Sequence, residues 1–432
     1  MKKLINKRIA DLSVLEKQQL LSRAAVDFDA LEPKIKDILH IVKTKKDEGL
    51  LELTQQFDHC SLTTLRVTPF EIEQAFEDID PQLIETFKHI ITNLTAFYQC
   101  EKPKEWSVDV DKGIKAGMLY RPYERVGFYV PGRKAHFPTI TLRMCVPAIV
   151  AGVKDIVLCS PPDAEGKISA GVLIAASLLG IKEIYKIGGA QAVGALTYGT
   201  QTIKPVQKIS AVGSPYVVAA QRMLFGHVGI EKLAGPSDAM ILCDETAHPQ
   251  IVAANFLTEI EHGPTSGTVA LVSSKAFAQQ LEEAILEFVK EAPQQQQGFF
   301  ETSLYTYSGI LIYDSLTQAM DFVNEYAPEH LQLTLKDSTW AIEKSQNVGA
   351  IQNGPYTMIA SGDFFGGTAN VLPTGGMAKI FSDISVMDFL KKVPIQAFDK
   401  QGFLNIADQG EQLAQYQQMF YHAKSIHLRK SI

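Results

Sequence analysis

The chain has 432 residues, of which 46% are hydrophobic and 21% charged, as in an ordinary globular protein. This length allows about three domains, and the net charge of −7 is spread along the sequence, which argues against a nucleic-acid groove. The longest apolar stretch, residues 170–181, is too short to span a membrane, and no secretory signal begins the chain. We therefore expect a cytoplasmic protein with neither nucleic acid nor membrane as a partner.

The amino-terminal part of the chain is predicted to be helical. Apolar residues recur at spacings of three and four in segments such as 35–42 and 83–97, as on one face of an amphipathic helix. We assign residues 1–23 to an amino-terminal helical segment. We expect residues 24–125 to join residues 239–381 in a first, discontinuous α/β domain.

Beyond this part, short β-branched runs alternate with helical stretches. The runs at 126–130, 155–159 and 183–187 are separated by turns that bear Gly and Pro, and a helix is predicted at 169–179. Continuous apolar strands with crossover helices are typical of a parallel sheet that is covered on both faces. Residues 126–238 are therefore predicted to form a second α/β domain.

A further series of elements follows the same alternation. Its members are strands at 239–243, 269–272 and 310–313 and helices at 251–260 and 275–291. The fold class is thus α/β, with two doubly wound, incomplete Rossmann-like parallel-sheet domains. After residue 381 the sequence becomes helical and rich in Gln, so we assign residues 382–432 to a small carboxyl-terminal tail domain.

Two turns follow predicted strands of the second domain. Tyr129 begins a Tyr-Val-Pro-Gly turn after the first strand, and Gln191 ends a Gly-Gly-Ala-Gln turn after the third. Open α/β sheets bind ligands at the carboxyl ends of their strands, and paired glycines let backbone N–H groups approach a phosphate. Neither turn has the G-x-G-x-x-G fingerprint, so a tight strand-to-helix connection is the alternative interpretation.

Two pairs of ionisable residues indicate metal or acid–base chemistry. Glu259 and His262 lie three residues apart near a helix end, so both project from one face, as in a metal site or in a helix-end salt bridge. Glu329 and His330 follow Pro328, which ends the preceding helix. An adjacent carboxylate and imidazole suit proton transfer, and a solvated loop is the alternative.

Taken together, these segments resemble the histidinol dehydrogenase family over essentially the whole chain. The matching stretches occur in the family's order and at its spacing. They are residues 126–132, 146–153, 158–162, 188–199, 234–237, 261–264, 327–331, 371–374 and 421–426.

The resemblance implies an NAD-dependent, zinc-assisted enzyme that oxidises L-histidinol through the aldehyde to L-histidine. Carried over by position, the residues at NAD would be Tyr129, Gln191 and Ser214. The zinc ligands would be Glu259, His262, Asp363 and His422. The residues at the substrate would be Ser237, Glu259, His262, His330, Asp363, Gln417 and His422.

The resemblance also implies catalytic roles and an assembly. His330 would be the base that removes the alcohol proton, and Glu329 would activate the water that hydrates the aldehyde. In the family the tail histidine comes from the partner subunit. We therefore expect a homodimer in which His422 completes the active site of the other chain.

Several positions depart from the family pattern. Glu259 stands where the family usually has Gln, and Ser214 replaces an Asn that contacts NAD. Asn370 stands where the family has His, and Gln417 replaces a substrate-binding Glu. The substrate pocket therefore loses an imidazole and a carboxylate.

Basic residues meanwhile follow Tyr129 where the family has small and neutral ones. They are Arg133, Lys134, His136 and Arg143. These side chains would bring positive charge to the entrance of the pocket, unless they point to solvent. A related zinc and NAD dehydrogenase for another small, possibly sulfonated, alcohol thus stays open, as does a binding protein that has lost turnover. The retained ligand and acid–base residues argue against the latter.

Overall fold

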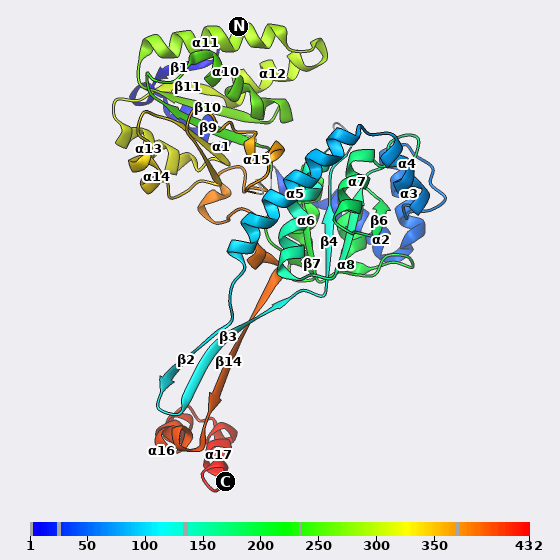
Figure 1. The fold of residues 1–432 in the computed structure, drawn as a ribbon, viewed down its shortest axis with the longest axis vertical. Coiled ribbons are helices and arrows are strands. Elements are labelled where there is room, and N and C mark those ends of the chain that lie inside the picture. Colours follow the sequence, from blue (N-terminus) through cyan, green and yellow to red (C-terminus); the bar gives the residue numbers. More distant parts are fainter. Residues whose placement is uncertain (1–2, 24–26, 133–136, 233–234, 369–370) are drawn as a thin grey trace.

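The computed structural model describes residues 3–23, 27–132, 137–232, 235–368 and 371–432. This part of the chain forms two α/β lobes and an arm that projects away from both of them (Figure 1). We name the lobes the five-stranded lobe and the six-stranded lobe after their sheets. The prediction of two doubly wound parallel-sheet domains is confirmed.

The five-stranded lobe contains a parallel sheet with the predicted alternation of strands and helices. In spatial order its strands are β6 (Glu183–Lys186), β5 (Asp155–Ser160), β4 (Arg125–Tyr129), β7 (Lys208–Ala211) and β8 (Gly229–Ile230). The helices between them are α6 (Pro138–Ala151), α7 (Ala170–Leu178), α8 (Gly189–Tyr198) and α9 (Pro215–Leu224). Because both faces are covered, the three central strands β5, β4 and β7 consist mostly of buried residues.

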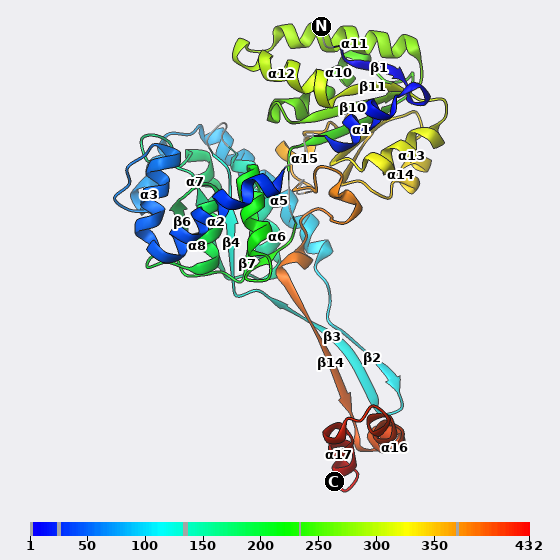
Figure 2. The same cartoon turned by 180° about the vertical axis from the view of Figure 1, so that it is seen from behind.

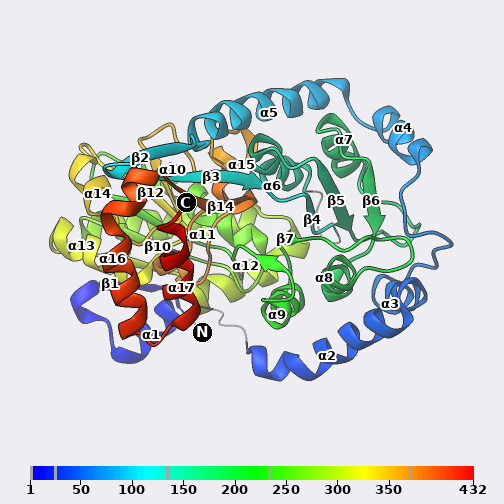
Figure 3. The ribbon, with the colours of Figure 1, turned by 90° about the horizontal axis from the view of Figure 1, so that it is seen from below.

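The amino-terminal helices cover this same sheet. Phe128 packs in one core with residues of α5 (Pro81–Glu101), and its neighbour Tyr129 packs in another with residues of α2 (Phe28–Lys45). Successive strand residues face opposite sides, so α5 and α2 lie on opposite faces, as Figure 3 shows. The helices α3 (Asp47–Asp58) and α4 (Pro69–Glu77) belong to the same lobe.

The expectation that residues 24–125 join residues 239–381 in one domain is therefore wrong. An amphipathic helix must bury its apolar face, but periodicity does not say against which sheet. Here the buried faces of α2 and α5 meet the sheet formed within residues 125–230.

The six-stranded lobe also contains a parallel sheet. In spatial order its strands are β1 (Ile5–Arg8), β11 (Gly309–Ile312), β10 (Gly267–Val272), β9 (Asp238–Cys243), β12 (His330–Thr334) and β13 (Ala350–Asn353). One face is covered by α10 (Pro249–Thr258), α11 (Lys275–Glu291) and α12 (Gln294–Tyr307). The other face is covered by α1 (Val14–Ser22), α13 (Leu316–Tyr326) and α14 (Thr339–Lys344), as seen from behind in Figure 2.

The amino-terminal segment differs from the helical one that we predicted. Residues 5–8 form an edge strand, with Ile5 opposite Gly309 in parallel register, and only α1 is an α-helix there. The strand reads Ile-Asn-Lys-Arg and none of its residues is fully buried. An edge strand of this kind has no apolar alternation that could identify it in the sequence.

The arm is a three-stranded antiparallel sheet that ends in two helices. β3 (Ile114–Pro122) lies between β2 (Trp106–Asp111) and β14 (Leu390–Phe398), and α16 (Lys400–Tyr416) and α17 (Phe420–Arg429) lie at its far end (Figure 1). The tail of residues 382–432 is therefore not wholly helical, because β14 pairs with a strand more than 260 positions earlier.

Among the described residues, no helix is long and apolar enough to cross a membrane.

A close contact attaches α16 to the arm. A Cβ added at Gly402 would collide with the backbone of Gly113 in the β2–β3 turn. We predict that Gly402→Ala displaces the first turn of α16, destabilises the tail by about 1–3 kcal/mol and increases its cleavage in limited proteolysis.

Gly410→Ala is the matched control, because its Cβ would meet only Ile426, at 3.4 Å. This control should leave the tail as protected as before or more so, since Ala favours a helix over Gly. Equal cleavage of both variants would contradict the assigned contact.

Candidate active site

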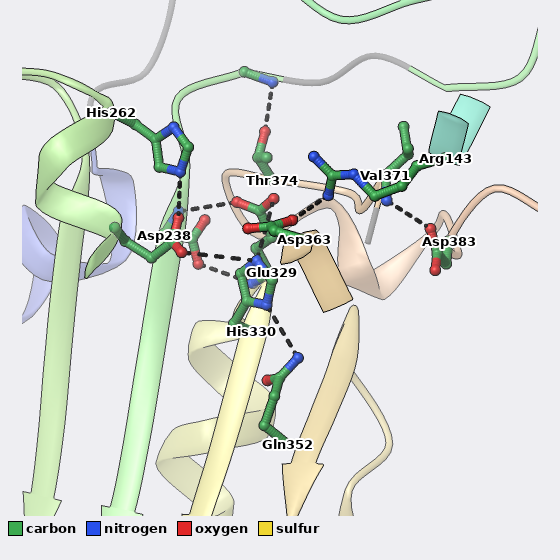
Figure 4. Close-up of polar contacts among 12 residues, drawn as sticks. Arg143, Asp238, His262, Glu329, His330, Gln352, Asp363, Val371, Thr374 and Asp383 are labelled. Carbon is green, nitrogen blue, oxygen red and sulfur yellow. Dashed lines mark hydrogen bonds and ion pairs between the residues drawn. The ribbon is translucent and has the colours of Figure 1, made fainter. Parts of the chain in front are cut away.

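The candidate site lies where the two lobes meet. Tyr129 ends β4 at the carboxyl edge of the five-stranded sheet, whereas His330 and Asp238 begin β12 and β9 at the amino edge of the other sheet. Arg143 of α6 forms an ion pair with Asp363 of α15 (Ser361–Phe364), which joins the lobes at this point (Figure 4). The acid–base residues thus lie at the strand edge opposite to the one where open α/β sheets usually bind ligands.

Reciprocal hydrogen bonds hold the Glu-His turn in place. The backbone N–H of Glu329 donates to Asp238 Oδ1 at 2.9 Å, and the backbone N–H of Asp238 donates to Glu329 Oε2 at 3.1 Å. Asp238 Oδ2 also accepts from the backbone N–H of Gly375 at 2.8 Å. Because Glu329 and His330 are only 7% and 3% exposed, the alternative of a solvated loop is excluded.

A buried arginine neutralises this turn. Arg23 Nη2 lies 3.3 Å from Asp238 Oδ1 and donates to the backbone oxygens of Tyr326, at 2.6 Å, and Ala327, at 3.3 Å. Ala327 has a left-handed backbone with φ of +53°, a conformation that costs a non-glycine residue free energy. Burial raises the pKa of Asp238, and the Arg23 charge opposes that rise. Arg23 therefore stabilises both the strained residue and the carboxylate that positions Glu329.

Two glutamates and two histidines converge next to this turn. His330 Nε2 lies 3.9 Å from Glu259 Oε1 and 3.8 Å from Glu329 Oε1, and His262 Nε2 lies 3.6 Å from Glu259 Oε2. Glu259 and His262 lie on the 3₁₀ turn Glu259–His262 that follows α10, as their spacing predicted. Glu259, Glu329 and His330 each offer one ligand atom within 4.8 Å of the others, a spacing that could hold a metal ion.

Burial controls the proton affinities of this cluster. It raises the pKa of Glu259 and Glu329 well above their ordinary value, and neighbouring carboxylates raise both further. It lowers the pKa of His330 to about 4 and also lowers that of His262. At neutral pH both imidazoles are thus uncharged, the form that accepts a proton or binds a metal.

The Gln352 amide orients His330. Its Nε2 lies 3.2 Å from His330 Nδ1 (Figure 4). A side-chain amide carries both a donor and an acceptor, so Gln352 can pair with either tautomer of the ring. The other ring nitrogen, Nε2, faces the carboxylates of Glu259 and Glu329.

The predicted dinucleotide residues gather at the carboxyl edge of the five-stranded sheet. The backbone N–H of Gly189, at the start of α8, donates to Tyr129 Oη at 3.1 Å. Gln191 is 2% exposed, and its Nε2 has no hydrogen-bond partner among the described residues. Ser214 occupies the N-cap position of α9 and is exposed. This edge therefore offers the start of α8 and an unused amide donor.

The remaining predicted residues lie in two different places. Ser237 is half-buried and directly precedes Asp238. Gln417 and His422 are exposed on the tail at the end of the arm, so one chain does not bring them to the other site residues (Figure 1).

The basic residues after Tyr129 do not form one exposed group. Arg143 lies inside α6 and is 7% exposed, so our placement of it at an entrance loop is wrong. The other three basic residues and one of the substituted positions lie outside the described residues. They are Arg133, Lys134, His136 and Asn370.

Three polar residues of the site were missed in the sequence. Asp238 directly precedes the predicted apolar strand 239–243. A charged residue at the start of an apolar strand is a signal that could have indicated a site at the strand edge. Arg23 and Gln352 carry no such signal, because their partners are far away in the chain.

We predict that Arg23→Met destabilises the protein by about 3–5 kcal/mol, because it leaves Asp238 as an uncompensated buried charge. Urea unfolding followed by circular dichroism would measure the loss. Lys17→Met is the matched control, since Lys17 forms an exposed ion pair with Glu325, and should change stability by less than about 1 kcal/mol. Similar losses in both variants would contradict a charge-neutralising role for Arg23.

Comparisons with known proteins agree with this architecture. A family model described as histidinol dehydrogenase matches residues 21–430. The histidinol dehydrogenase of Methanothermobacter thermautotrophicus is 36% identical over 422 residues, 98% of this chain and 99% of that protein. The Synechocystis sp. protein of the same name is 37% identical over 431 residues, with 98% and 99% covered.

A solved structure extends the similarity to three dimensions. The crystal structure of histidinol dehydrogenase from Elizabethkingia anophelis matches with a TM-score of 0.93 at 32% identity, and the match covers 99% of this chain and 98% of that one. Family model, relatives and structure each cover nearly the whole chain, so the chain belongs to the histidinol dehydrogenase family.

Proposed function

We propose that the protein oxidises L-histidinol through the aldehyde to L-histidine, with transfer of hydride to NAD in both steps. The observation that carries this proposal is the buried Glu329–His330 pair beside Glu259, in a chain of this family. The anionic alcohol that the sequence departures left open is not favoured by the comparisons.

His330 is the proposed general base. Since burial lowers its pKa to about 4, its imidazole is neutral at neutral pH and can take the hydroxyl proton as hydride leaves the adjacent carbon. Glu329 is proposed to activate the water that hydrates the aldehyde. Its raised pKa makes the ionised carboxylate a stronger base than an exposed one.

The residues present fit a zinc ion. Glu259 Oε1 is buried without a hydrogen-bond partner in the described part of the chain, and the neutral imidazole of His262 lies beside the same carboxylate. Mixed oxygen and nitrogen donors suit zinc, so we propose Glu259, His262 and Asp363 as ligands from one chain. A bound zinc ion would hold and orient the donor groups of the substrate.

The carboxyl edge of the five-stranded sheet is the proposed NAD site. The N–H groups that begin α8 can bind a phosphate. The buried Nε2 of Gln191 has no hydrogen-bond partner in the described part of the chain, and a ligand could supply that partner. We propose that Tyr129 and Ser214 contact the same ligand, since Tyr129 ends β4 and Ser214 follows the neighbouring strand β7 at that edge.

A homodimer with shared sites is the proposed assembly. His422 is the proposed fourth zinc ligand, and it lies on the arm, far from the other three ligands of its own chain (Figure 1). The arm also exposes large apolar side chains, among them Trp106 at 52%, Phe420 at 68% and Tyr421 at 78%. So many exposed apolar side chains favour burial of the arm against another protein surface. In a homodimer, that surface would belong to a second copy, and each chain would place its tail at the site of the other.

The proposed activity predicts two molecules of NADH for each L-histidinol consumed, measured by absorbance with the zinc-loaded protein. We expect His330→Asn to lower alcohol oxidation by on the order of 10²-fold or more. Glu329→Gln should slow aldehyde oxidation much more than alcohol oxidation.

His248→Asn, which changes an exposed imidazole, is the control and should retain full activity. Equal losses in both half-reactions for His330→Asn and Glu329→Gln would contradict the division of roles. No NADH from L-histidinol with the unmodified protein would contradict the proposed function itself.

The shared site can be tested with two inactive variants. His262→Ala and His422→Ala should each abolish turnover alone. After mixing and verified subunit exchange, each mixed dimer should contain one intact site, so activity should return to about one quarter of the original for random pairing. Absence of recovery in verified mixed dimers would contradict ligation across subunits.

A further inference from the structure

The contact between Arg143 and Asp363 is the unexpected feature of the site. Both side chains are largely buried, with 9% and 17% exposed, and they approach from different lobes (Figure 4). Asp363 is a proposed zinc ligand, and one of its carboxylate oxygens forms this ion pair with the Arg143 guanidinium.

The charges around this contact show what the arginine contributes. The acidic groups of the site are Asp238, Glu259, Glu329 and Asp363. Arg23 contacts the first of them and Arg143 the last. In addition, the Arg143 charge opposes the rise in the pKa of Glu259 that burial causes. Arg143 thus partly neutralises the acidic cluster.

The same charge acts on the nitrogen donors. The negative charge of the Asp363 carboxylate acts on His262 and His330, and the charge of Arg143, which contacts that carboxylate, opposes it at both imidazoles. Arg143 therefore offsets part of the negative potential that would attract a divalent cation next to these imidazoles.

We propose that Arg143 competes with the metal ion for Asp363 and thereby weakens metal binding at this site. The inference rests on the zinc ligands of the proposed function. The opposite possibility is an arginine that orients Asp363 toward the metal, as hydrogen-bonded neighbours of metal ligands often do. The two differ in sign, because removal of a competing arginine strengthens metal binding and removal of an orienting one weakens it.

The test is the zinc affinity of the metal-free full-length protein, measured by competition with a chromogenic chelator. We expect Arg143→Met and Arg143→Gln to lower the Kd for Zn²⁺ by about tenfold or more, since a charge-assisted contact no longer has to be broken. Arg121→Gln is the matched control, because Arg121 forms an exposed pair with Glu105, and its Kd should not change.

Stability supplies a second measurement. Without zinc, Arg143→Gln should unfold at a lower temperature than the unmodified protein, and zinc should raise its Tm by more. A variant that folds only with zinc would agree with the proposal, because the metal then supplies the missing positive charge. A folded variant with equal or weaker zinc binding, or one that stays unfolded with zinc present, would overturn it.

The outcome is separable from that of the proposed function. Tighter zinc binding by Arg143→Gln without L-histidinol turnover by any of the proteins would count against the activity and leave the competition standing. L-histidinol turnover by the unmodified protein, together with zinc affinities that do not differ between the unmodified protein and the Arg143 variants, would support the activity and count against the competition.

Discussion

Charge compensation at a buried acidic cluster is the constraint on which the site depends. Asp238 is 1% exposed, and an isolated carboxylate cannot stay ionised there at acceptable cost. Arg23 supplies the opposite charge, and the backbone N–H groups of Glu329 and Gly375 supply hydrogen bonds. With Asp238 held in this way, Glu329 is fixed at the start of β12 and His330 follows it into the buried space beside Glu259.

The arrangement of the lobes explains how one site can offer such different chemistry. The five-stranded sheet contributes its carboxyl edge, where glycine turns and helix starts provide N–H donors. The six-stranded sheet contributes its amino edge, where Asp238 and His330 begin strands. Donors that suit phosphate and acids that suit a cation or a proton thus face each other, as a hydride transfer between a dinucleotide and an alcohol would need.

Two sequence departures take on a joint meaning in this setting. Glu259 adds a negative charge where the family usually has Gln, and Arg143 adds a positive one that reaches the same cluster. In the sequence, this arginine is one of four basic residues that suggest an entrance for anionic substrates. In the folded chain it lies within α6, so its charge acts on the cluster of acids and imidazoles.

The sequence by itself determined the features that depend on neighbouring residues. The alternation of apolar strands with crossover helices predicted two parallel sheets, and the Glu259/His262 and Glu329/His330 pairs predicted the centre of the site. Such patterns can be recognised in a sequence because buried residues recur with the period of the helix or strand that contains them. The resemblance to a family added the proposed roles of Asp363 and His422, which no local pattern distinguishes.

Only the tertiary structure decided which elements pair and which charges meet. The helices α2 and α5 could have covered either sheet, and β14 needed β3 as a partner to become a strand. Asp363 and Arg143 lie 220 positions apart in the chain, and Arg23 is similarly far from Asp238. Contacts of this kind depend on how distant segments pack in the folded chain, because the cost of burying a charge depends on the groups that the fold places beside it.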